Sequence, residues 1–434
     1  MKTVIMAGGR GTRISELFPD IPKPMIPING MPILEREIIS LVEQGFDDII
    51  ITISYKGEII KNYFGDGAKW NASIQYYEED IPLGNAGALY KLKDVLIEPF
   101  LLLNADAVFD VDFRRMMKYH MEKKALITLF THPNSHPYDS GLIVADEYGY
   151  VLEWLTKEDV RPEYYKNRVN AGMHILDPEV LDLIKVNIEK IGEKDLETGK
   201  IYKVDLDRQL LKPFAGTGKM VCYDSSEYVK DMGTPERFCS VQKDFALGRV
   251  QRRNLKNKQK AIFIDRDGTV NKYVGFLREI DEFELLEGVA EAIKKVNASE
   301  FLIIVITNQP VIARGEVSKK KLNLIHNKME TLLGEQGAYL DGIYYCPHHP
   351  HRGYEGEIPE LKIECECRKP KAGMFMKAAE KFNIDLQESW MIGDGKVDIL
   401  AGKEAGCKTA LIGQGKYGQD MTGESLLNII NKIF

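Results

Sequence analysis

The chain has 434 residues, of which 44% are hydrophobic and 28% are charged, and it carries a formal net charge of −7 at pH 7. The length predicts two or three domains, the composition is that of an ordinary globular protein, and the negative charge argues against binding of nucleic acid by bulk electrostatic attraction. No apolar run approaches the roughly 20 residues that cross a bilayer, and the amino-terminal apolar stretch is too short for a signal peptide. We therefore expect a cytoplasmic protein that binds neither nucleic acid nor a membrane.

Two stretches of the chain share one pattern, a short apolar run followed by a loop rich in Gly, Asp or Arg. They are TVIMAGGRGTR at 3–13 and AIFIDRDGTVN at 261–271. Each is typical of the first strand of an α/β domain, whose ligands lie beyond the carboxyl ends of parallel strands. The basic, polar segment 249–260 indicates a linker or an exposed helix. Further apolar runs alternate with segments of helical spacing, so we expect mainly parallel sheets in domains at 1–248 and 261–434.

The glycine loop after the first predicted strand lacks the G-K-[ST] ending of a Walker loop, and Ile14 stands where the dinucleotide pattern has its third glycine. Gly8, Gly9 and Gly11 nevertheless let backbone N–H groups approach an anion closely. Arg13 can add a charge that binds phosphate through two hydrogen bonds. A plain glycine turn explains this loop equally well when it is considered alone.

Four later stretches of the first half favour phosphate binding. Lys23 lies between prolines that stiffen its loop, and PLGNAGAL at 82–89 is a small-residue loop on which a flat base can lie. The apolar run LLLNAD ends on Asp106, and Asp231 stands just before a glycine turn. Two acids at separate strand ends, together with a lysine and an arginine, could hold magnesium and a triphosphate.

In this order the first half resembles the sugar-1-phosphate nucleotidyltransferases, which show G-G-x-G-[ST]-R, P-K-P, L-G-[ST]-A-G-A, an N-x-D strand end and D-x-G-T-P. The resemblance covers about residues 1–240 and implies a Rossmann-like domain with a mixed, mostly parallel sheet. It implies that Arg13 and Lys23 contact phosphates and that Asp106 and Asp231 bind Mg²⁺. Asn85 departs from the family's usual Thr or Ser. The other residues implied in nucleotide or sugar binding are Gly8, Gly9, Gly11, Thr12, Gly84 and Asn170.

The reaction that this resemblance implies needs no nucleophile from the enzyme. An oxygen of the sugar phosphate attacks the α-phosphorus of the nucleoside triphosphate, and pyrophosphate leaves. Cationic side chains and the metal stabilise the charge that spreads over the phosphates.

The second half begins with two carboxylates on one short loop. Asp265 and Asp267 stand two residues apart at the end of a predicted buried strand. Residues two apart in an extended chain share a face, so both side chains could meet one Mg²⁺. Two like charges this close are costly unless a cation lies between them. Further polar residues follow at later strand ends and in a basic cluster: Thr307, Lys369, Asp394 and Asp398.

This order resembles the haloacid-dehalogenase-like (HAD-like) phosphatases. The resemblance implies a Rossmann-like domain in which Asp265 is the nucleophile and passes through an aspartyl-phosphate. Asp267 would protonate the leaving oxygen and then activate water, while Thr307 and Lys369 would hold the transferring phosphoryl group. The implied Mg²⁺ ligands are Asp265, Asp267 and Asp394, with Asp398 orienting its neighbours.

Three of the six cysteines lie in the segment 346–374. Six cysteines in a chain this long do not form a disulfide framework, and in a reducing compartment a cluster is more often metal-binding or catalytic. A Cys-x-His pair and a Cys-x-Cys pair supply four ligands for a closed tetrahedral zinc site. Such a site would fix the conformation of the loop and orient Arg368 and Lys369 towards a substrate. The predicted ligands are Cys346, His348, Cys365 and Cys367; His349 or His351 could replace His348, and unrelated reduced thiols are the alternative.

The pattern C-x-H…C-x-C-R-K-P, with D-R-D-G-T-[IV]-N and T-N-Q…A-R-G, resembles the zinc-containing heptose-bisphosphate phosphatases and the related histidinol-phosphate phosphatases over about residues 260–415. The resemblance implies that 273–276 and the loop with Asn308 and Gln309 line the substrate pocket, and that Arg368 helps to choose the substrate. The departures from the pattern concern the pocket: they are Pro310, Val311, Gly395 and the sixteen residues between His348 and Cys365.

A fusion of two enzymes suggests consecutive steps. The resembled phosphatases remove the 7-phosphate of D-glycero-D-manno-heptose 1,7-bisphosphate and leave a sugar 1-phosphate, which is the substrate type of the first half. We therefore expect a bifunctional enzyme of GDP-D-glycero-α-D-manno-heptose synthesis, with GTP chosen by this pathway logic. One alternative is a histidinol-phosphate phosphatase fused to another hexose-1-phosphate nucleotidyltransferase. The other is a phosphatase regulated by a first half that senses nucleotides without catalysis. Oligomeric state and anomer stay open.

Overall fold

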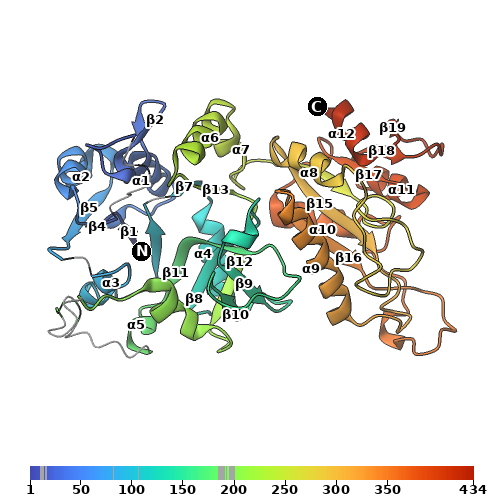
Figure 1. The fold of residues 1–434 in the computed structure, drawn as a ribbon, viewed down its shortest axis with the longest axis horizontal. Coiled ribbons are helices and arrows are strands. Elements are labelled where there is room, and N and C mark those ends of the chain that lie inside the picture. Colours follow the sequence, from blue (N-terminus) through green and yellow to red (C-terminus); the bar gives the residue numbers. More distant parts are fainter. Residues whose placement is uncertain are drawn as a thin grey trace. The chain divides into compact units, whose positions relative to one another are not determined.

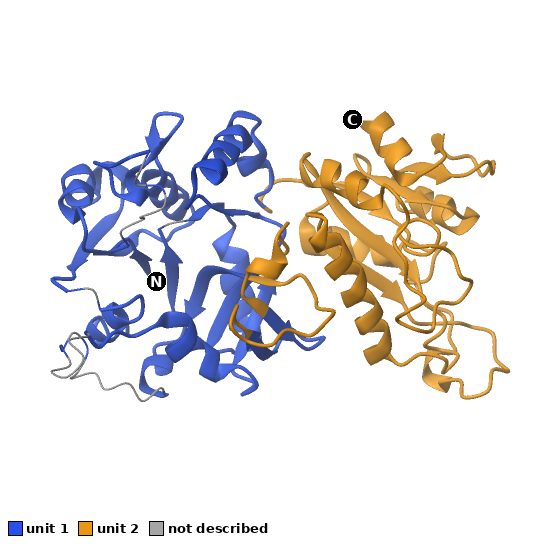
Figure 2. Ribbon diagram, in the orientation of Figure 1, with its two compact units in different colours: residues 1–131, 143–154, 170–254 blue, residues 132–142, 155–169, 255–434 orange. Residues whose placement is uncertain are grey.

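The computed structural model describes residues 1–9, 14, 17–81, 83–105, 107–183, 191, 193–194 and 201–434. The chain divides into two compact units (Figures 1 and 2). Unit 1 comprises 1–131, 143–154 and 170–254, and unit 2 comprises 132–142, 155–169 and 255–434. The last crossing between the units lies between Asn254 and Leu255, within the segment 249–260 that was expected as a linker.

The main sheet of unit 1 has, among the described residues, nine strands in the order β10-β9-β11-β6-β1-β4-β5, with β8 pairing with β11 and β12. The strands β6, β1, β4 and β5 run parallel, whereas β11 is antiparallel to β6 and β9. The bounds are β1 Lys2–Met6, β4 Asp48–Ile53, β5 Ser73–Glu78, β6 Phe100–Asn104, β8 Ile127–His132, β9 Leu142–Ala145, β10 Val151–Leu155, β11 Val169–Leu176 and β12 Met220–Asp224. The predicted mixed, mostly parallel sheet is confirmed.

The central strands of this sheet are buried on both faces. In β1, Val4 belongs to one hydrophobic cluster and Ile5 to another, because adjacent residues of a strand point to opposite sides. This explains why β1, β4 and β6 are continuous apolar runs rather than alternating ones. The helices of unit 1 are α1 Ile33–Glu43, α2 Gly57–Phe64, α3 Gly87–Lys91, α4 Phe113–Lys123, α5 Glu179–Leu183, α6 Pro235–Ala246 and α7 Arg249–Arg252.

Smaller elements complete unit 1. An antiparallel pair joins β7 (Ala107–Asp110) to β13 (Tyr228–Asp231), and in its register Asp231 lies opposite Ala107. A second pair joins β2 Pro27–Ile28 and β3 Met31–Pro32. The short helical turns are η1 Lys23–Met25, η2 Ala68–Trp70, the π-helical turn η5 Leu206–Leu211 and η6 Lys212–Phe214.

Unit 2 is built on a parallel sheet of six strands in the order β16-β15-β14-β17-β18-β19. The strands are β14 Lys260–Ile264, β15 Phe301–Asn308, β16 Gly342–Cys346, β17 Trp390–Gly393, β18 Lys408–Ile412 and β19 Met421–Gly423. The helical elements are η3 Pro137–Asp139, α8 Val289–Asn297, α9 Lys319–Glu335, η7 Pro359–Leu361, α10 Gly373–Phe382, α11 Lys396–Glu404 and α12 Leu426–Ile433.

Helices cover both faces of this second sheet (Figure 1). Ile262 and Ile264 of β14 pack with α8, α9 and α12, whereas Phe263 packs with α10 and α11. Because β15 lies on one side of β14 and β17 on the other, the chain reverses its direction of strand addition at β14. In open α/β sheets the carboxyl ends of the strands form a binding crevice at such a reversal. Unit 2 therefore has the predicted α/β architecture, and the rule places a binding site at the ends of β14, β15 and β17.

Within the described part of the chain, every helix is too short or too polar to span a membrane.

Candidate active sites

A buried cluster of charges lies at the carboxyl end of the sheet in unit 2. The Nζ atom of Lys369 is 2.8 Å from Asp265 Oδ1 and 2.5 Å from Asp398 Oδ1, and it donates a hydrogen bond to the carbonyl oxygen of Ile306 at 2.9 Å. The side chains of Lys369 and Asp398 are each 1% exposed. The structure thus brings the predicted nucleophile Asp265, which follows β14, together with the lysine from a segment 104 residues later.

The pKa shifts in this cluster reflect burial and the close approach of its charged groups. Burial disfavours the charged form of Lys369, but the carboxylates of Asp265 and Asp398 outweigh burial and raise its pKa. Burial raises the pKa of Asp265 to about 6, with Lys369 acting in the opposite direction. Burial and the charge of Asp265 also raise the pKa of Asp394. A divalent cation among these carboxylates would relieve their mutual repulsion.

Three carboxylates are close enough to share such a cation: one oxygen from each of Asp265, Asp394 and Asp398 lies within 4.8 Å of the others. Asp398 is already engaged, because its Oδ1 binds Lys369 and its Oδ2 accepts from the Gly395 N–H at 3.0 Å, at the start of α11. Asp398 therefore binds the lysine, and its predicted role of orienting its neighbours stays a prediction. Oxygen ligands from Asp265 and Asp394 fit the preference of Mg²⁺.

Gly268 explains why the D-x-D-G-T loop needs its glycine. Its φ is +85°, and a Cβ at this position would lie 2.1 Å from Asp394 Oδ2. A side chain here would therefore both strain the backbone and displace the Asp394 carboxylate. The glycine lets the loop that carries Asp265 approach the end of β17.

The carboxylate of Asp267 is held apart from the three-carboxylate group. Its oxygens accept hydrogen bonds from Arg266, from Gln309 Nε2 at 2.9 Å and from Asn271 Nδ2 at 3.1 Å. The acid–base role and the Mg²⁺ role that the sequence implies for Asp267 both stay predictions. Neither Arg266 nor Asn271 was singled out from the sequence, although both lie within four residues of Asp267.

The T-N-Q loop connects these groups. Thr307 and Gln309 are 1% and 2% exposed, and Gln309 Nε2 donates to Thr307 Oγ1 at 2.9 Å. The side chain of Asn308 makes two hydrogen bonds to the backbone of Lys369. Its Oδ1 accepts from the Lys369 N–H and its Nδ2 donates to the Lys369 carbonyl, both at 3.0 Å. Asn308, predicted to line the substrate pocket, here positions the lysine.

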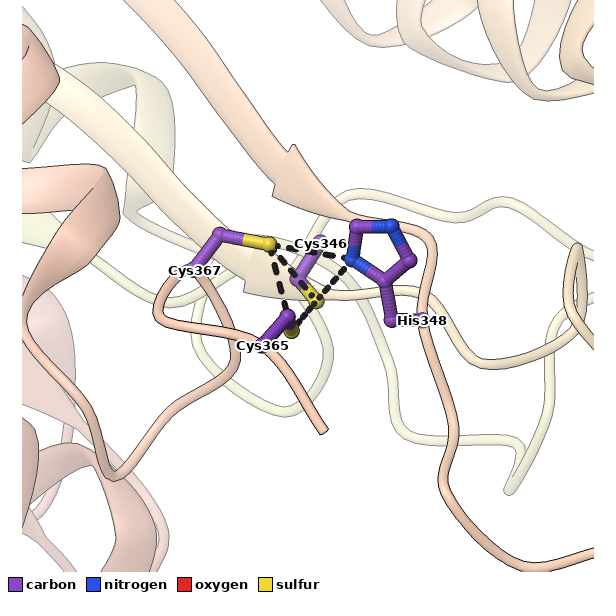
Figure 3. A group of neighbouring side chains, drawn as sticks. All are labelled: Cys346, His348, Cys365 and Cys367. Atoms are coloured by element: carbon purple, nitrogen blue, oxygen red, sulfur yellow. Dashed lines mark hydrogen bonds between the residues drawn. The ribbon is translucent and has the colours of Figure 1, made fainter. Parts of the chain in front are cut away.

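The cysteine-rich segment forms a second compact group (Figure 3). Cys346 ends β16, and the other ligand candidates come from the loop that leads to α10. The Cys367 sulfur lies 3.2 Å from Cys346 Sγ, 3.4 Å from Cys365 Sγ and 3.2 Å from His348 Nδ1. All four donor atoms lie within 4.8 Å of one another. The contact between the two sulfurs lowers the pKa of the Cys367 thiol to about 5 and raises that of the Cys346 thiol, so Cys367 is the thiol of this pair that ionises first.

Of the three nearby histidines, His348 joins this group. His349 is turned elsewhere: its Nδ1 donates to the His351 carbonyl at 3.2 Å and its Nε2 accepts from Arg314 at 3.3 Å. Arg368 Nη1 donates to the carbonyl oxygen of His348 at 3.1 Å. The backbone beside the sulfur group therefore holds Arg368, one residue before the lysine of the charged cluster.

In unit 1, Lys23 and Asp231 meet from positions 208 residues apart. Lys23 Nζ lies 3.0 Å from Asp231 Oδ1, and Arg237 Nη1 binds the other carboxylate oxygen at 2.5 Å. Burial alone would raise the pKa of Asp231, but Lys23 and Arg237 lower it overall. Thr234 caps α6 and Pro235 begins it, so the G-T-P motif starts the helix that presents Arg237. Arg237 was not predicted, although its place in the first turn of α6 could have indicated it.

Several predicted residues of unit 1 fall outside the described residues: Gly11, Thr12, Arg13 and Asp106. Their neighbours are described. Gly8 and Gly9 follow β1, between the ends of β4 and β6, at the edge where the sheet presents its strand ends. Asp231 lies opposite Ala107, the residue after Asp106. The roles expected for the undescribed residues stay predictions.

The small-residue loop at 83–89 is held by packing. Gly84 has φ +85°, and a Cβ there would lie 2.4 Å from the Val204 carbonyl oxygen. Asn85 Oδ1 accepts from the Leu206 N–H at 2.7 Å. Asn85, which departs from the family pattern, therefore fastens the loop to the segment at 204–206, and the glycine allows the close approach.

Asn170 is oriented from its own strand, β11. Its Oδ1 faces His174 Nε2 at 3.2 Å and accepts from the Gly172 N–H at 3.3 Å. Burial lowers the pKa of His174 to about 3, so the ring is neutral at physiological pH. Gly172 makes room for Asn104, since a Cβ would lie 2.6 Å from Asn104 Nδ2. The predicted N-A-G and N-x-D motifs thus pack against each other at the ends of β11 and β6.

Comparison with known proteins accounts for both halves. A profile of the nucleotidyl transferase family matches residues 2–247, and one described as HAD-hydrolase-like matches 366–428. A D-glycero-beta-D-manno-heptose-1,7-bisphosphate 7-phosphatase from Haemophilus ducreyi is 41% identical over 181 residues, which are 40% of this chain and 97% of that protein.

Two solved structures are also similar. HddC from Yersinia pseudotuberculosis, complexed with GMP-PN, is 24% identical at a TM-score of 0.45 and covers 56% of this chain and 99% of its own. A D,D-heptose 1.7-bisphosphate phosphatase from B. bronchiseptica, complexed with magnesium and phosphate, is 31% identical at a TM-score of 0.36 and covers 40% of this chain and 98% of its own.

The two enzyme classes predicted from the sequence, a nucleotidyltransferase and a phosphatase, are confirmed. The chain belongs to the nucleotidyl transferase family through residues 2–247 and, through its carboxyl-terminal region, to the family of the D-glycero-β-D-manno-heptose-1,7-bisphosphate 7-phosphatases.

Proposed function

We propose that this chain removes the 7-phosphate of D-glycero-D-manno-heptose 1,7-bisphosphate and then transfers GMP from GTP to the resulting heptose 1-phosphate, with release of pyrophosphate. One observation carries the proposal. A domain 41% identical to a heptose-bisphosphate phosphatase, over 97% of that protein's length, shares its chain with a nucleotidyl transferase domain. The product of the first reaction is a sugar 1-phosphate, which is a substrate type of the second family.

In the phosphatase step, a carboxylate oxygen of Asp265 attacks the phosphorus of the 7-phosphate, and the bond from phosphorus to the sugar oxygen breaks. Asp267 gives a proton to that oxygen, and then takes one from the water that hydrolyses the aspartyl-phosphate to inorganic phosphate. Lys369 and Thr307 hold the phosphoryl oxygens. The position of Lys369, 2.8 Å from Asp265 Oδ1, supports this assignment, because its charge then lies beside the bond that forms.

Asp265, through its carboxylate, and Asp394 would together hold Mg²⁺ at the site of attack. When bound, the ion would neutralise the phosphate that approaches a buried, negatively charged cluster. The carboxylate oxygens within 4.8 Å of one another support this assignment.

In the transferase step, the 1-phosphate oxygen attacks the α-phosphorus of GTP. Lys23, and Arg13 in the undescribed loop, would bind the phosphates, and Asp106 and Asp231 would hold Mg²⁺. Lys23 is 7% exposed and pairs with Asp231. When substrates bind, Lys23 would leave Asp231 for the triphosphate, and Asp231 would bind the cation. The base specificity rests on the reaction sequence alone.

The sulfur-rich group fits zinc. Three thiol sulfurs and one imidazole nitrogen match the ligand types of structural zinc sites, and their mutual approach leaves room for one small ion. Zinc there would fasten the loop that carries Arg368 and Lys369. Thiolate ligands persist in a reducing compartment, which is in keeping with the expected cytoplasmic location.

The proposal also has to specify which anomer of the heptose substrate the enzyme uses. The GDP route named above uses the α-anomer, whereas the relative at 41% identity carries β in its name. This observation favours testing a second candidate, in which the same two reactions run on the β-anomer with another nucleoside triphosphate.

The test is mass spectrometry of the products after incubation of the purified chain with Mg²⁺, each nucleoside triphosphate and either anomer of heptose 1,7-bisphosphate. We expect GDP-heptose from GTP and the α-anomer. A nucleotide-heptose from the β-anomer alone would establish the second candidate. An unchanged bisphosphate would remove the heptose assignment and make histidinol phosphate the next substrate.

Two variants serve as controls in this assay. Asp265→Asn should leave the bisphosphate intact but still convert added heptose 1-phosphate, and Lys23→Met should accumulate heptose 1-phosphate because its transferase step is slower. If the wild-type chain produces only heptose 1-phosphate with every nucleoside triphosphate, the alternative of a nucleotide-sensing first half of the chain would be supported.

A further inference from the structure

Arg266 lies between the two aspartates of the D-R-D-G-T loop, and its side chain is 0% exposed. Its guanidinium faces Asp267: Nη2 donates to both carboxylate oxygens at 2.9 Å, and Nε is 3.2 Å from Oδ1. A guanidinium presents its donors in a rigid planar fork, which fixes the plane of a carboxylate as a flexible ammonium cannot.

A second layer of side chains holds Arg266 itself. Nη1 faces His326 Nε2 at 3.2 Å, and Nη2 also donates to Gln309 Oε1 at 3.1 Å. His326 is 5% exposed and belongs to α9, sixty residues from the arginine. Burial, followed by the charge of Arg266, lowers the pKa of His326 well below its usual value, so the neutral ring accepts this hydrogen bond.

The network closes on the carboxylate from the other side. Gln309 Nε2 donates to Asp267 Oδ2 at 2.9 Å, and Asn271 Nδ2 donates to Oδ1 at 3.1 Å. Each oxygen of Asp267 thus receives donors from more than one direction. Since a buried cation without partners is costly, Arg266 is stable in this place because Asp267, Gln309 and His326 satisfy it together.

We propose that Arg266 and His326 are positioning residues for Asp267, with Arg266 fixing the plane of the carboxylate and His326 fixing the plane of Arg266. The inference rests on the proposed acid–base role of Asp267 in the phosphatase reaction. It extends the site beyond the loops at the strand ends, to a helix that touches no reacting atom.

Leaving-group dependence tests this role. A sugar oxygen leaves well only when it is protonated, whereas p-nitrophenolate leaves without a proton. General acid catalysis contributes about 10²- to 10⁴-fold. We expect Arg266→Lys to lower kcat on heptose bisphosphate about 10²-fold and His326→Leu about 10-fold, both with little change in KM. The rapid-mixing burst of p-nitrophenolate from p-nitrophenyl phosphate should stay within about twofold, since that step needs no acid.

Matched variants separate positioning from packing. His326→Gln keeps an acceptor oxygen for Arg266 and should retain most of the activity. Met329→Ala removes packing from the same helix, at a fully buried residue, and should leave kcat close to wild type. Zinc content and the nucleotidyltransferase rate of the same preparations control for folding of the chain.

Three outcomes would count against the inference. Equal loss with both substrates, equal loss in Met329→Ala, or equal loss in His326→Gln and His326→Leu would each show a packing effect and overturn it. Asp267→Asn is the reference. If that variant itself shows no leaving-group dependence, the proposed role of Asp267 fails and the inference fails with it. If p-nitrophenyl phosphate is not a substrate, kcat of His326→Gln against His326→Leu on the bisphosphate decides.

Discussion

The candidate sites of the two units hold their charges in different ways. In unit 2 the side chains of Lys369 and Asp398 are each 1% exposed, and they bind one another and Asp265 inside the protein. In unit 1 the side chain of Asp231 is 36% exposed and that of its partner Arg237 is 33% exposed. Both sites lie at the strand ends of an α/β sheet. The unit 2 site is mostly buried, with Asp394 exposed, whereas in unit 1 Lys23 is buried and Asp231 and Arg237 are partly exposed.

This difference fits the two proposed reactions. A covalent mechanism needs its nucleophile at a fixed place before the substrate arrives, because orientation removes much of the entropic barrier. A nucleotidyltransferase without an enzyme nucleophile must admit a triphosphate and a sugar phosphate and release pyrophosphate, so its cations need to exchange partners. We therefore expect loss of the nucleophile in unit 2 to abolish one activity, and loss of a single cation in unit 1 to weaken the other.

The largest effect is expected for Asp265→Asn. The amide cannot form the aspartyl-phosphate, so phosphate release should fall by at least about 10⁴-fold. The pyrophosphate released from GTP and added heptose 1-phosphate should be unchanged. Residual phosphatase activity near the wild-type rate would show that Asp265 is not the nucleophile.

Loss of the proposed zinc should have the next largest effect, because metal binding contributes directly to the folding free energy of a small loop that the metal holds together. Treatment with a chelator, or Cys367→Ser, should lower the unfolding temperature of unit 2 and its phosphatase rate while unit 1 keeps its own transition. Differential scanning calorimetry with metal analysis checks this. Cys239→Ser, at an exposed cysteine outside the group, is the matched control. A stoichiometric metal other than zinc would correct the assignment.

Lys23→Met should lower the transferase rate by about 10²- to 10³-fold, the usual loss when one charged or hydrogen-bonding group no longer stabilises a transition state. The effect is smaller than that of Asp265→Asn because Arg13 and the metal would still bind the phosphates. Initial rates of pyrophosphate release measure it, with phosphatase activity as the internal control. A loss as complete as that of Asp265→Asn would contradict the contrast between the two sites.

The smallest effect concerns acid stability. Burial lowers the pKa of His174 in unit 1 to about 3 and that of His326 in unit 2 well below its usual value, whereas an unfolded histidine titrates near about 6.5. Below that pH the unfolded chain binds protons that the folded chain does not. The contribution of each histidine to the free energy of unfolding is therefore fully present above about pH 6.5. It falls as the pH drops towards the folded pKa, and each histidine accounts for up to about 1.4 kcal/mol per pH unit.

Urea unfolding at several values between pH 7.5 and 5.5 measures this slope. His174→Asn should flatten the slope for unit 1, and His326→Gln should flatten it for unit 2. Equal slopes in wild type and both variants would mean that other groups cause the acid sensitivity.

Many features of the sites could be predicted from the sequence because they depend on local order. Asp265 and Asp394 directly follow apolar runs that are buried on both faces of a parallel sheet, and such runs are recognisable as strands. The Cys-x-His and Cys-x-Cys pairs place their donors close together through spacing alone. Gly268 stands where a short loop must let another strand end approach.

The direction of each side chain could not be read in this way. The sequence suggested that Asp265 and Asp267 share a face, which stays a prediction, but it did not indicate that Arg266, Gln309 and Asn271 hold the Asp267 carboxylate. The pocket role predicted for Asn308 stays a prediction, and the role of Asn85 was left uncertain. In the structure both side chains bind backbone. A polar side chain takes the orientation that satisfies most of its hydrogen bonds, and its partners come from distant segments.

Sequence patterns were enough to predict two α/β domains, their order, the strand-end aspartates and the grouping of the cysteines, because strand periodicity and short spacings act over a few residues. Packing of distant segments brings Lys369 between Asp265 and Asp398, Arg237 to Lys23 at Asp231, and His326 behind Arg266. These contacts depend on how whole elements pack, since burial of a charge is tolerated only where a partner of suitable geometry arrives from another part of the chain.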